Sequence, residues 1–397
     1  MIKIRFKRLL TLALLSFAPP VFATPAPRER SKDTLQTVHQ FFGSMPTGVT
    51  VSQKGRIFVN YPRWGDPVPF TVAEIKNGRE VPFPSREINA FGANGSRAML
   101  SQELSDRGER QRYLHFVSVQ SVVVDPFDRL WVLDTGSVRF GPVAWSGPKL
   151  VCVDLNTNRV VSKILLPSEP ANTYPNDVRF DFSKGREGFA YITDSGASGI
   201  ITVDLGSGKT NRSLIKHAST GAEPKFVPFP EGRAMFATPP GKFPTYVKIQ
   251  TDGIAISNDG SRLFYCPLAS RRLYSVSTSA LRDFNASDAQ VAATVVDHGD
   301  KGMSDGLESD AQGRVYCTQL ETNSISRRLP NGLFETVVQS DRLLWPDTLS
   351  LASDGFLYVI SNQLHRQKGF HSGRDLRQKP FSLFRIRVAD ARPIRLK

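Results

Sequence analysis

One short pattern recurs six times along this chain of 397 residues, and it constrains the fold more than any other feature. Each copy is a pair of polar or small residues followed by an alternation of apolar with other residues, which indicates a strand with one buried face. A short turn containing Gly or Asp leads from each copy to a second strand-like run, as a tight hairpin requires. The six copies are 47–51, 120–124, 176–180, 252–256, 305–309 and 347–351.

Most copies continue into a third and a fourth strand. The third is predicted at 149–154 and 200–204, for example, and the fourth at 160–166 and 291–296. Four-stranded units repeated about an axis are typical of a β-propeller. The sixth copy has only one further clear strand, 381–388, so we expect 35–42 to supply its missing partner. Such a closure removes open sheet edges. The sequence therefore predicts an all-β, six-bladed β-propeller closed by an N-terminal strand that joins the last blade.

The N-terminal segment has a different character from the repeats. Four basic residues precede an apolar run, 9–17, and Ala23 follows it, which is the layout of a secretory signal peptide. The run is shorter than the roughly 20 residues that span a membrane. We therefore expect a signal peptide at 1–23, a flexible segment at 24–34, and one propeller domain at 35–397. The predicted mature protein is exported, either periplasmic or secreted, without a transmembrane segment.

Charge and cysteine content exclude some functions. The formal net charge is +14, but the basic residues are scattered and form no basic helix, so nucleic-acid binding is not predicted. Cys152, Cys266 and Cys317 lie in apolar, strand-like runs and outside any CxxC pattern. We expect them to be buried free thiols rather than metal ligands. The chain also lacks the G-x-S-x-G, HExxH, Walker and Rossmann patterns.

The predicted architecture gathers polar residues at one end of a central channel, because the innermost strand of every blade begins at its rim. The six strand starts are Thr47, Gln120, Asn176, Asp252, Asp305 and Asp347. The loops after the second strands return to the same face and bring Tyr61, Asp134, Thr135, Asp194, Ser195, Glu321, Asn323 and Asn362. Clustered carboxylates are costly to bury unless something neutralises them.

Three kinds of site would suit this cluster. A hard cation such as Ca²⁺ takes oxygen ligands, a protonated amine would pair with carboxylates, and a raised pKa would suit acid–base chemistry. The alternative is structural, since Asp and Asn at strand starts also bind backbone amides. The candidate acid and base are Asp305 and Asp347. The candidate ligand-binding residues are Gln120, Asn176, Asp177 and Asp252. The candidate metal ligands are Asn176, Asp252 and Asp305.

Several longer motifs resemble the Yellow / major royal jelly protein family, including its bacterial, dopachrome-tautomerase-related members. The resemblance covers about 116–364. Its motifs are Asp125-Pro126, 129–136, Asn176-Asp177, 190–196, 252–255, 273–276, 304–306 and 344–349. The family fold is a six-bladed propeller. The resemblance implies either a dopachrome-type tautomerase or a protein that binds a biogenic amine in its central cavity, with Thr348 and Asn362 in that cavity near Asp305 and Asp347.

A neighbouring propeller class, the gluconolactonase and regucalcin-like hydrolases, gives the alternative function. These enzymes hold one divalent metal in the channel, and Asn176 with Asp252 or Asp305 matches part of that ligand set. The first-blade Glu of that class is replaced here by Thr47, unless Asp347 or Glu321 takes its role. The leading prediction is an exported propeller that binds a small aromatic or cationic ligand and isomerises it. A calcium-dependent lactone or ester hydrolase and a non-catalytic binding module are the alternatives.

Overall fold

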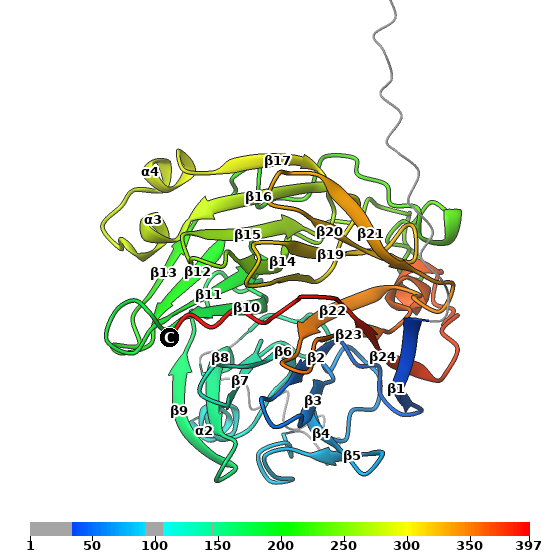
Figure 1. Ribbon diagram of the computed structural model, residues 1–397. Coiled ribbons are helices and arrows are strands. Elements are labelled where there is room, and N and C mark those ends of the chain that lie inside the picture. Colours follow the sequence, from blue (N-terminus) through cyan, green and yellow to red (C-terminus); the bar gives the residue numbers. More distant parts are fainter. Residues whose placement is uncertain (1–33, 92–105, 144–145) are drawn as a thin grey trace, which may run out of the picture.

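The computed structural model describes residues 34–91, 106–143 and 146–397, and it confirms the six-bladed β-propeller. Six four-stranded antiparallel sheets surround a centre (Figure 1). The predicted signal peptide and most of the predicted flexible segment lie outside the described residues. Among the described residues, no helix is both long enough and apolar enough to cross a membrane.

Each sheet begins with its innermost strand. The first comprises β2 (Gly48–Val51), β3 (Ile57–Asn60), β4 (Val72–Lys76) and β5 (Arg79–Pro82). The second comprises β6 (Val119–Val124), β7 (Arg129–Asp134), β8 (Lys149–Asp154) and β9 (Arg159–Leu165). The third comprises β10 (Pro175–Asp181), β11 (Phe189–Asp194), β12 (Ile200–Asp204) and β13 (Thr210–Ser213).

The remaining sheets follow the same order. The fourth comprises β14 (Thr251–Ile256), β15 (Arg262–Pro267), β16 (Arg272–Ser277) and β17 (Val296–Asp300). The fifth comprises β18 (Leu307–Ser309), β19 (Val315–Gln319), β20 (Ser324–Arg328) and β21 (Phe334–Gln339). The sixth comprises β22 (Pro346–Leu351), β23 (Phe356–Ser361), β24 (Phe381–Arg387) and β1 (Leu35–Phe41). The short helices are α2 (Asp106–Leu114), α3 (Thr278–Arg282), α4 (Asp288–Ala292), η2 (Pro230–Gly232), η3 (Leu364–Arg366) and η4 (Lys368–Phe370).

The predicted closure of the ring is confirmed. β1 pairs antiparallel with β24, from Leu35 opposite Ile386 to Phe41 opposite Phe381. The sixth sheet is therefore built from both ends of the chain, and no strand partner is missing from it. The three cysteines are buried and free, as expected.

The hydrophobic core is divided among the interfaces between neighbouring sheets. Six separate clusters each combine buried residues from two adjacent sheets, and together they cover all six interfaces of the ring. The cluster between the sixth and first sheets, for example, joins Phe41 and Ile360 to Val49 and Val59. Each sheet therefore buries its faces against its neighbours.

Turn chemistry explains the hairpins next to the innermost strands. Gly55, Gly260, Gly313 and Gly355 all have positive φ in these turns, where glycine carries no steric cost. In the second sheet, Asp128 takes the left-handed conformation instead. The side chain of Asp125 accepts hydrogen bonds from the turn amides of Phe127 and Arg129.

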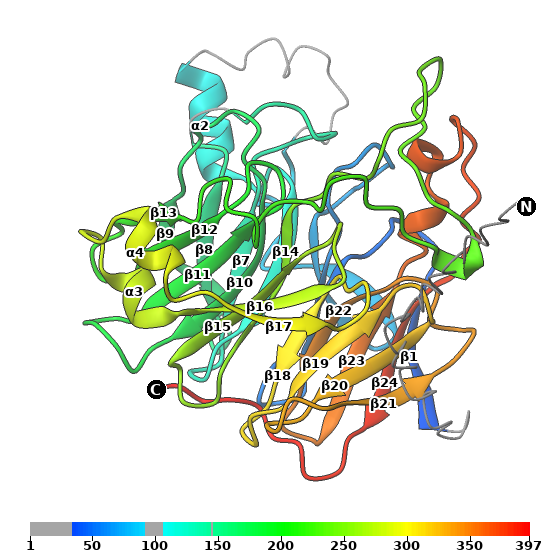
Figure 2. The ribbon, with the colours of Figure 1, turned by 90° about the horizontal axis from the view of Figure 1, so that it is seen from above.

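One predicted strand is wrong. Residues 291–296 were expected to form the outer strand of the fourth sheet, but α4 occupies their beginning and β17 starts only at Val296. The reason is a capping box, in which Ser287 and Gln290 satisfy each other's backbone amides. Figure 2 shows long loops and α2 gathered on one face of the ring.

The closing strand offers a direct test of the ring. Phe41 is fully buried in the cluster between the sixth and first sheets, whereas the adjacent Phe42 is 68% exposed. We expect Phe41→Ala to lower the free energy of unfolding by about 3–5 kcal/mol, because it leaves a cavity where the ring closes. Phe42→Ala is the matched control and should change it by less than about 0.5 kcal/mol. Denaturant unfolding measures both values, and equal losses would contradict this role of β1.

Candidate functional site

The starts of the innermost strands meet at one end of the channel, as the sequence predicts. In four sheets the pairing register is irregular at these starts, between Val119 and Ser121, Pro175 and Val178, Thr251 and Ile254, and Pro346 and Leu349. Such bulges release residues from the ladder and redirect their side chains. The released residues include Gln120, Asn176, Asp177, Asp252, Asp347 and Thr348.

Close packing of neighbouring strands explains the glycines beside two carboxylates. A Cβ atom on Gly253 would collide with the carbonyl oxygen of Asp305, and one on Gly306 would collide with that of Asp347. The Gly306 amide donates a hydrogen bond to the same Asp347 oxygen at 3.1 Å. The backbones of the fourth, fifth and sixth innermost strands are therefore in contact, which brings their acidic residues together.

Asp252, Asp305 and Asp347 form the centre of this site, which we call the carboxylate end. Each has one main side-chain partner that is neutral. Asn176 Nδ2 donates to Asp252 at 2.5 Å, and Asn362 Nδ2 donates to Asp347 at 2.5 Å. Among the described residues, no Lys, Arg or His side chain forms an ion pair with these three carboxylates. Their charges are thus not compensated by a neighbouring cation.

Burial raises the pKa of each of these carboxyl groups, and the charges of neighbouring carboxylates raise it further. For Asp252 the largest cause is burial, followed by the charge of Asp305. The pKa of Asp305 rises to about 6 because of burial, although a hydrogen bond from Trp345 opposes the rise. Burial and the charge of Asp305 raise the pKa of Asp347. The site therefore holds fewer than three negative charges when no cation is present.

Asp177 and Gln120 lie beside this cluster. Burial raises the pKa of Asp177, and the Arg179 charge partly offsets that rise. The charge of Asp177 in turn contributes to the raised pKa values of all three carboxyls of the carboxylate end. Gln120 accepts a hydrogen bond from the Tyr174 hydroxyl at 3.0 Å. Both predicted ligand-binding residues thus lie in the same electrostatic environment as the carboxylates.

Thr348 and Asn362 occupy different surroundings. Asn362 lies at the carboxylate end, where its amide bonds Asp347 and the Pro46 carbonyl oxygen. The Thr348 hydroxyl is 3.3 Å from Asp347, yet Thr348 also lines a cavity that opens further along the channel. Thr47 is held by the Asn60 amide at 2.9 Å, so its hydroxyl has a structural partner.

Aromatic side chains also contact the carboxylate end, although no role was predicted for them from the sequence. Trp345 is fully buried and donates its indole N–H to Asp305 at 2.7 Å. Its φ of 55° lies in the left-handed region that bulky residues rarely adopt. The Trp-Pro pair immediately before the last strand start is the sequence signal that would have identified this residue.

A second aromatic group lies over the second and third strand starts. Trp64 donates its indole N–H to the Tyr174 hydroxyl at 2.6 Å. The Phe140 ring stacks on Trp64 with centroids 5.1 Å apart and lies 5.7 Å from Tyr174, while remaining 60% exposed. The Asp252 charge acts on Tyr174. These rings therefore extend from the carboxylates toward solvent.

Three acidic residues of the returning loops have structural partners instead. Asp134 accepts from the amides of Val117 and Ser118 and pairs with buried Lys149 at 2.7 Å. Asp194 accepts from backbone amides and pairs with Arg212. Glu321 pairs with Arg271 and accepts from the Phe229 amide. These three acidic residues therefore have the structural role considered as the alternative above, in which an acidic side chain binds backbone amides and holds a loop in place.

The predicted metal ligands lie close together, but they are engaged in hydrogen bonds with one another and with Trp345. Asn176 directs its amide nitrogen toward Asp252, and Asp305 is engaged by the Trp345 indole. Calcium needs six to eight converging oxygen atoms. Among the described residues, no group of three or more His, Cys, Asp or Glu side chains has a geometry that could hold a metal ion. The residues present therefore do not fit the metal centre of the hydrolase alternative.

Comparison with solved structures shows the same fold. A protein with a provisional assignment as a gluconolactonase has a TM-score of 0.51 and 10% identity, covering 90% of this chain and 94% of that protein. Regucalcin from Agrobacterium tumefaciens has a TM-score of 0.49 and 13% identity, covering 91% and 98%. At this level of identity the likeness shows the propeller fold alone.

Sequence relatives are more specific. Protein yellow from Drosophila guanche is 28% identical over 281 residues, which are 66% of this chain and 44% of the relative. Major royal jelly protein 7 from Apis mellifera is 27% identical over 230 residues, which are 55% of this chain and 48% of the relative. Each match spans less than half of the relative's length.

A family model described as major royal jelly protein matches residues 117–394. This match covers four complete sheets and three of the four strands of the sixth, and it includes the carboxylate end together with Gln120 and Asn362. On this basis the chain belongs to the major royal jelly protein family.

Proposed function

We propose that the carboxylate end binds a small ligand that carries both a protonated amine and an aromatic ring. The observation that carries this proposal is the set of three buried carboxyl groups, Asp252, Asp305 and Asp347, which have raised pKa values and, among the described residues, no ion pair with a Lys, Arg or His side chain. A cation bound among these carboxylates would neutralise their negative charge and offset the free-energy cost of burying them.

The neighbouring rings supply the aromatic part of this proposal. Trp345 contacts Asp305 directly, and the exposed Phe140 ring forms the outer edge of the Trp64 and Tyr174 group. Aromatic faces attract cations and stack on other rings. A ligand with an amine among the carboxylates would place its ring against the exposed Phe140, because Trp345 is fully buried and stacks on His365. Export is part of the same proposal, because residues 1–23 have the layout of a signal peptide.

The same groups support an isomerisation of the bound ligand. A pKa of about 6 allows Asp305 to exchange a proton near neutral pH. In this proposal one carboxylate, at Asp305 or Asp347, removes a proton from one atom of the ligand, and the protonated partner returns a proton to another atom. No net oxidation occurs, and the two carboxyl groups exchange protonation states. Aminochromes of the dopachrome type are the first substrates to test, as the family resemblance implies.

Ligand binding tests the charge requirement. We expect the protein to bind tryptamine more tightly than tryptophol, in which a hydroxyl replaces the amine. Asp305→Asn and Asp347→Asn should each weaken tryptamine binding by about tenfold, because each removes one ionic contact. Asp341→Asn is the matched control, since Asp341 is an exposed carboxylate outside the channel. Isothermal titration calorimetry measures these affinities.

Two results would overturn the binding proposal. One is equal affinity for tryptamine and tryptophol, which would show that the amine charge is not recognised. The other is unchanged tryptamine affinity in both Asp305→Asn and Asp347→Asn while each variant keeps its fold by circular dichroism.

The pH dependence of binding follows from the raised pKa of Asp305. Below a pH of about 6 this carboxyl becomes neutral, whereas an alkyl amine stays protonated throughout this range. Affinity for tryptamine should therefore fall as the pH drops from 7 to 5. The stability of the ligand-free protein should change with pH in the opposite direction. Because the folded state binds the Asp305 proton more tightly than the unfolded state does, the free energy of unfolding falls as the pH rises from about 4 to 6. Asp305→Asn should flatten both profiles, and a pH-independent affinity in the unaltered protein would contradict the assignment.

Removal of divalent metal distinguishes this function from the hydrolase alternative. We expect a chelator to leave tryptamine affinity unchanged and added calcium to induce no lactone hydrolysis, because Asn176 and Trp345 donate hydrogen bonds to Asp252 and Asp305. Affinity measured with and without chelator, together with a lactone hydrolysis assay, checks both points. Calcium-dependent lactone turnover that is lost in Asp252→Asn would favour the hydrolase.

A further inference from the structure

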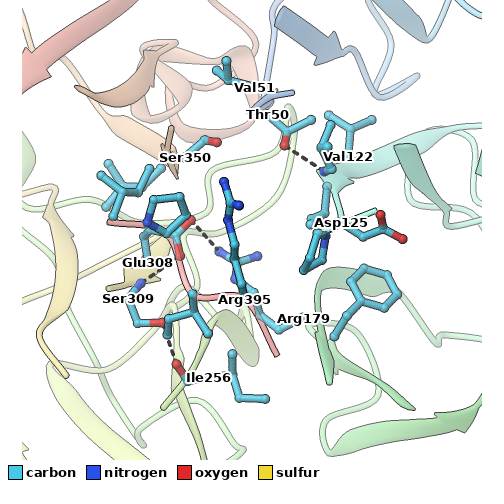
Figure 3. Close-up of a pocket in the computed structure, with 18 of the residues that line it drawn as sticks. Thr50, Val51, Val122, Asp125, Arg179, Ile256, Glu308, Ser309, Ser350 and Arg395 are labelled. Carbon is cyan, nitrogen blue, oxygen red and sulfur yellow. Dashed lines mark hydrogen bonds and ion pairs between the residues drawn. The ribbon is translucent and has the colours of Figure 1, made fainter. Parts of the chain in front are cut away.

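A cavity opens at the end of the channel opposite the carboxylates. Its volume is about 140 Å³, and its walls come from the later residues of the innermost strands and from residues 393–396 near the C-terminus. Figure 3 shows Arg179, Glu308, Ser350 and Arg395 around it. The volume is roughly ten times the smallest space that holds one water molecule. This cavity, the strap cavity, is therefore large enough for a small organic or inorganic ion.

The C-terminal strap, residues 388–397, crosses this end of the channel (Figure 1). It is anchored to the fifth sheet by a hydrogen bond from the Ala311 amide to the Arg392 carbonyl oxygen, at 2.9 Å. It is anchored to the third sheet by a hydrogen bond from the Phe182 amide to the Leu396 carbonyl oxygen, at 3.1 Å. Arg395 lies between these anchors and is thereby held over the channel.

Arg179 is a buried cation in the wall of this cavity and is only 8% exposed. Its guanidinium donates to the Val178 and Leu307 carbonyl oxygens, at 2.9 and 2.7 Å. The Glu308 carboxylate is 4.0 Å away, beyond hydrogen-bond distance. Arg179 Nε has no hydrogen-bond partner among the described residues. Arg179 therefore pairs with Glu308 without a hydrogen bond and keeps one buried N–H donor that an anion could satisfy.

Further donors face the same space. Within the part of the chain that the structure describes, the Arg395 side chain has no hydrogen bond or ion pair, although Arg395 lines the cavity. The Thr50 hydroxyl accepts from the Val124 amide at 2.9 Å, so its own O–H is available to donate. Glu308, by contrast, accepts from the Ser309 amide at 2.8 Å. The cavity is thus lined by Arg179, Arg395 and the Thr50 hydroxyl. Glu308 is the acidic residue nearest to Arg179.

We propose that the strap cavity binds a small oxyanion, of carboxylate or phosphate size, between Arg179 and Arg395. The anion accepts hydrogen bonds from the two guanidinium groups, which match the geometry of such oxygens. Binding of the anion stabilises the strap, because it connects the C-terminal segment to the innermost strand of the third sheet. This site is independent of the amine site proposed for the opposite end.

The test uses the full chain with acetate or inorganic phosphate, at constant ionic strength maintained with chloride. Either anion should raise the Tm in a saturable manner, because a ligand that binds only the folded state stabilises it. Arg395→Gln should weaken the apparent affinity about tenfold through loss of a charged hydrogen bond. Arg392→Gln is the matched control, because Arg392 is an exposed strap residue that contributes its backbone carbonyl and does not line the cavity.

A third variant should change the anion affinity in the opposite direction. Glu308→Gln should tighten anion binding severalfold, because it removes a competing negative charge and keeps an acceptor for the Ser309 amide. A response to only one anion supports the proposal and identifies the preferred oxyanion geometry. The proposal is overturned if neither anion raises the Tm more than chloride does, or if Arg395→Gln and Arg392→Gln respond alike.

Discussion

The pairing of β1 with β24 is the constraint on which the whole ring depends. The hydrophobic clusters lie between sheets rather than within them, so each sheet needs a neighbour on both sides. Without β1 the sixth sheet would lose its outermost strand, and Phe41 would leave the cluster that joins the last sheet to the first. Ring closure therefore fixes the distance between the innermost strands, and this distance determines what the channel can contain.

The channel has two chemically different ends because of the order of residues along each innermost strand. β10 contains Asn176 and Asp177 near its start and continues through Arg179, so a single strand contributes to both ends. At the first end, close contact of neighbouring backbones forces Asp252, Asp305 and Asp347 together, and their pKa values rise. At the second end, Arg179 bonds to carbonyl oxygens and keeps a positive charge within the ring. The electrostatic potential should therefore reverse its sign along the channel axis.

Sequence periodicity predicted the fold well because a blade is a local unit with its own strand and turn signals. The six strand starts and the closing strand at 35–42 follow from alternation and a missing partner, and β1 confirms them. The strand at 291–296 was predicted wrongly because the capping box at Ser287 outweighs the apolar pattern. The convergence of Asp252, Asp305 and Asp347 could be inferred from topology, but the irregular register beside Asp252 and Asp347 could not, because the alternation of residues along a strand does not mark it. Trp345 and Arg179 were missed because Asp305 and Leu307, to which they donate hydrogen bonds, are distant from them in the sequence.

Ring closure also has a consequence for the order in which the molecule can assemble. β1 is synthesised first, but its partner β24 follows more than three hundred residues later. Contacts between segments so far apart carry a large loop-closure entropy and form slowly. During synthesis the early sheets can form their hairpins, yet the edge of the first sheet and the strand β1 must wait for the end of the chain. The last step of folding is thus the joining of the two ends of the sequence, and until then the channel and both of its charged ends do not exist.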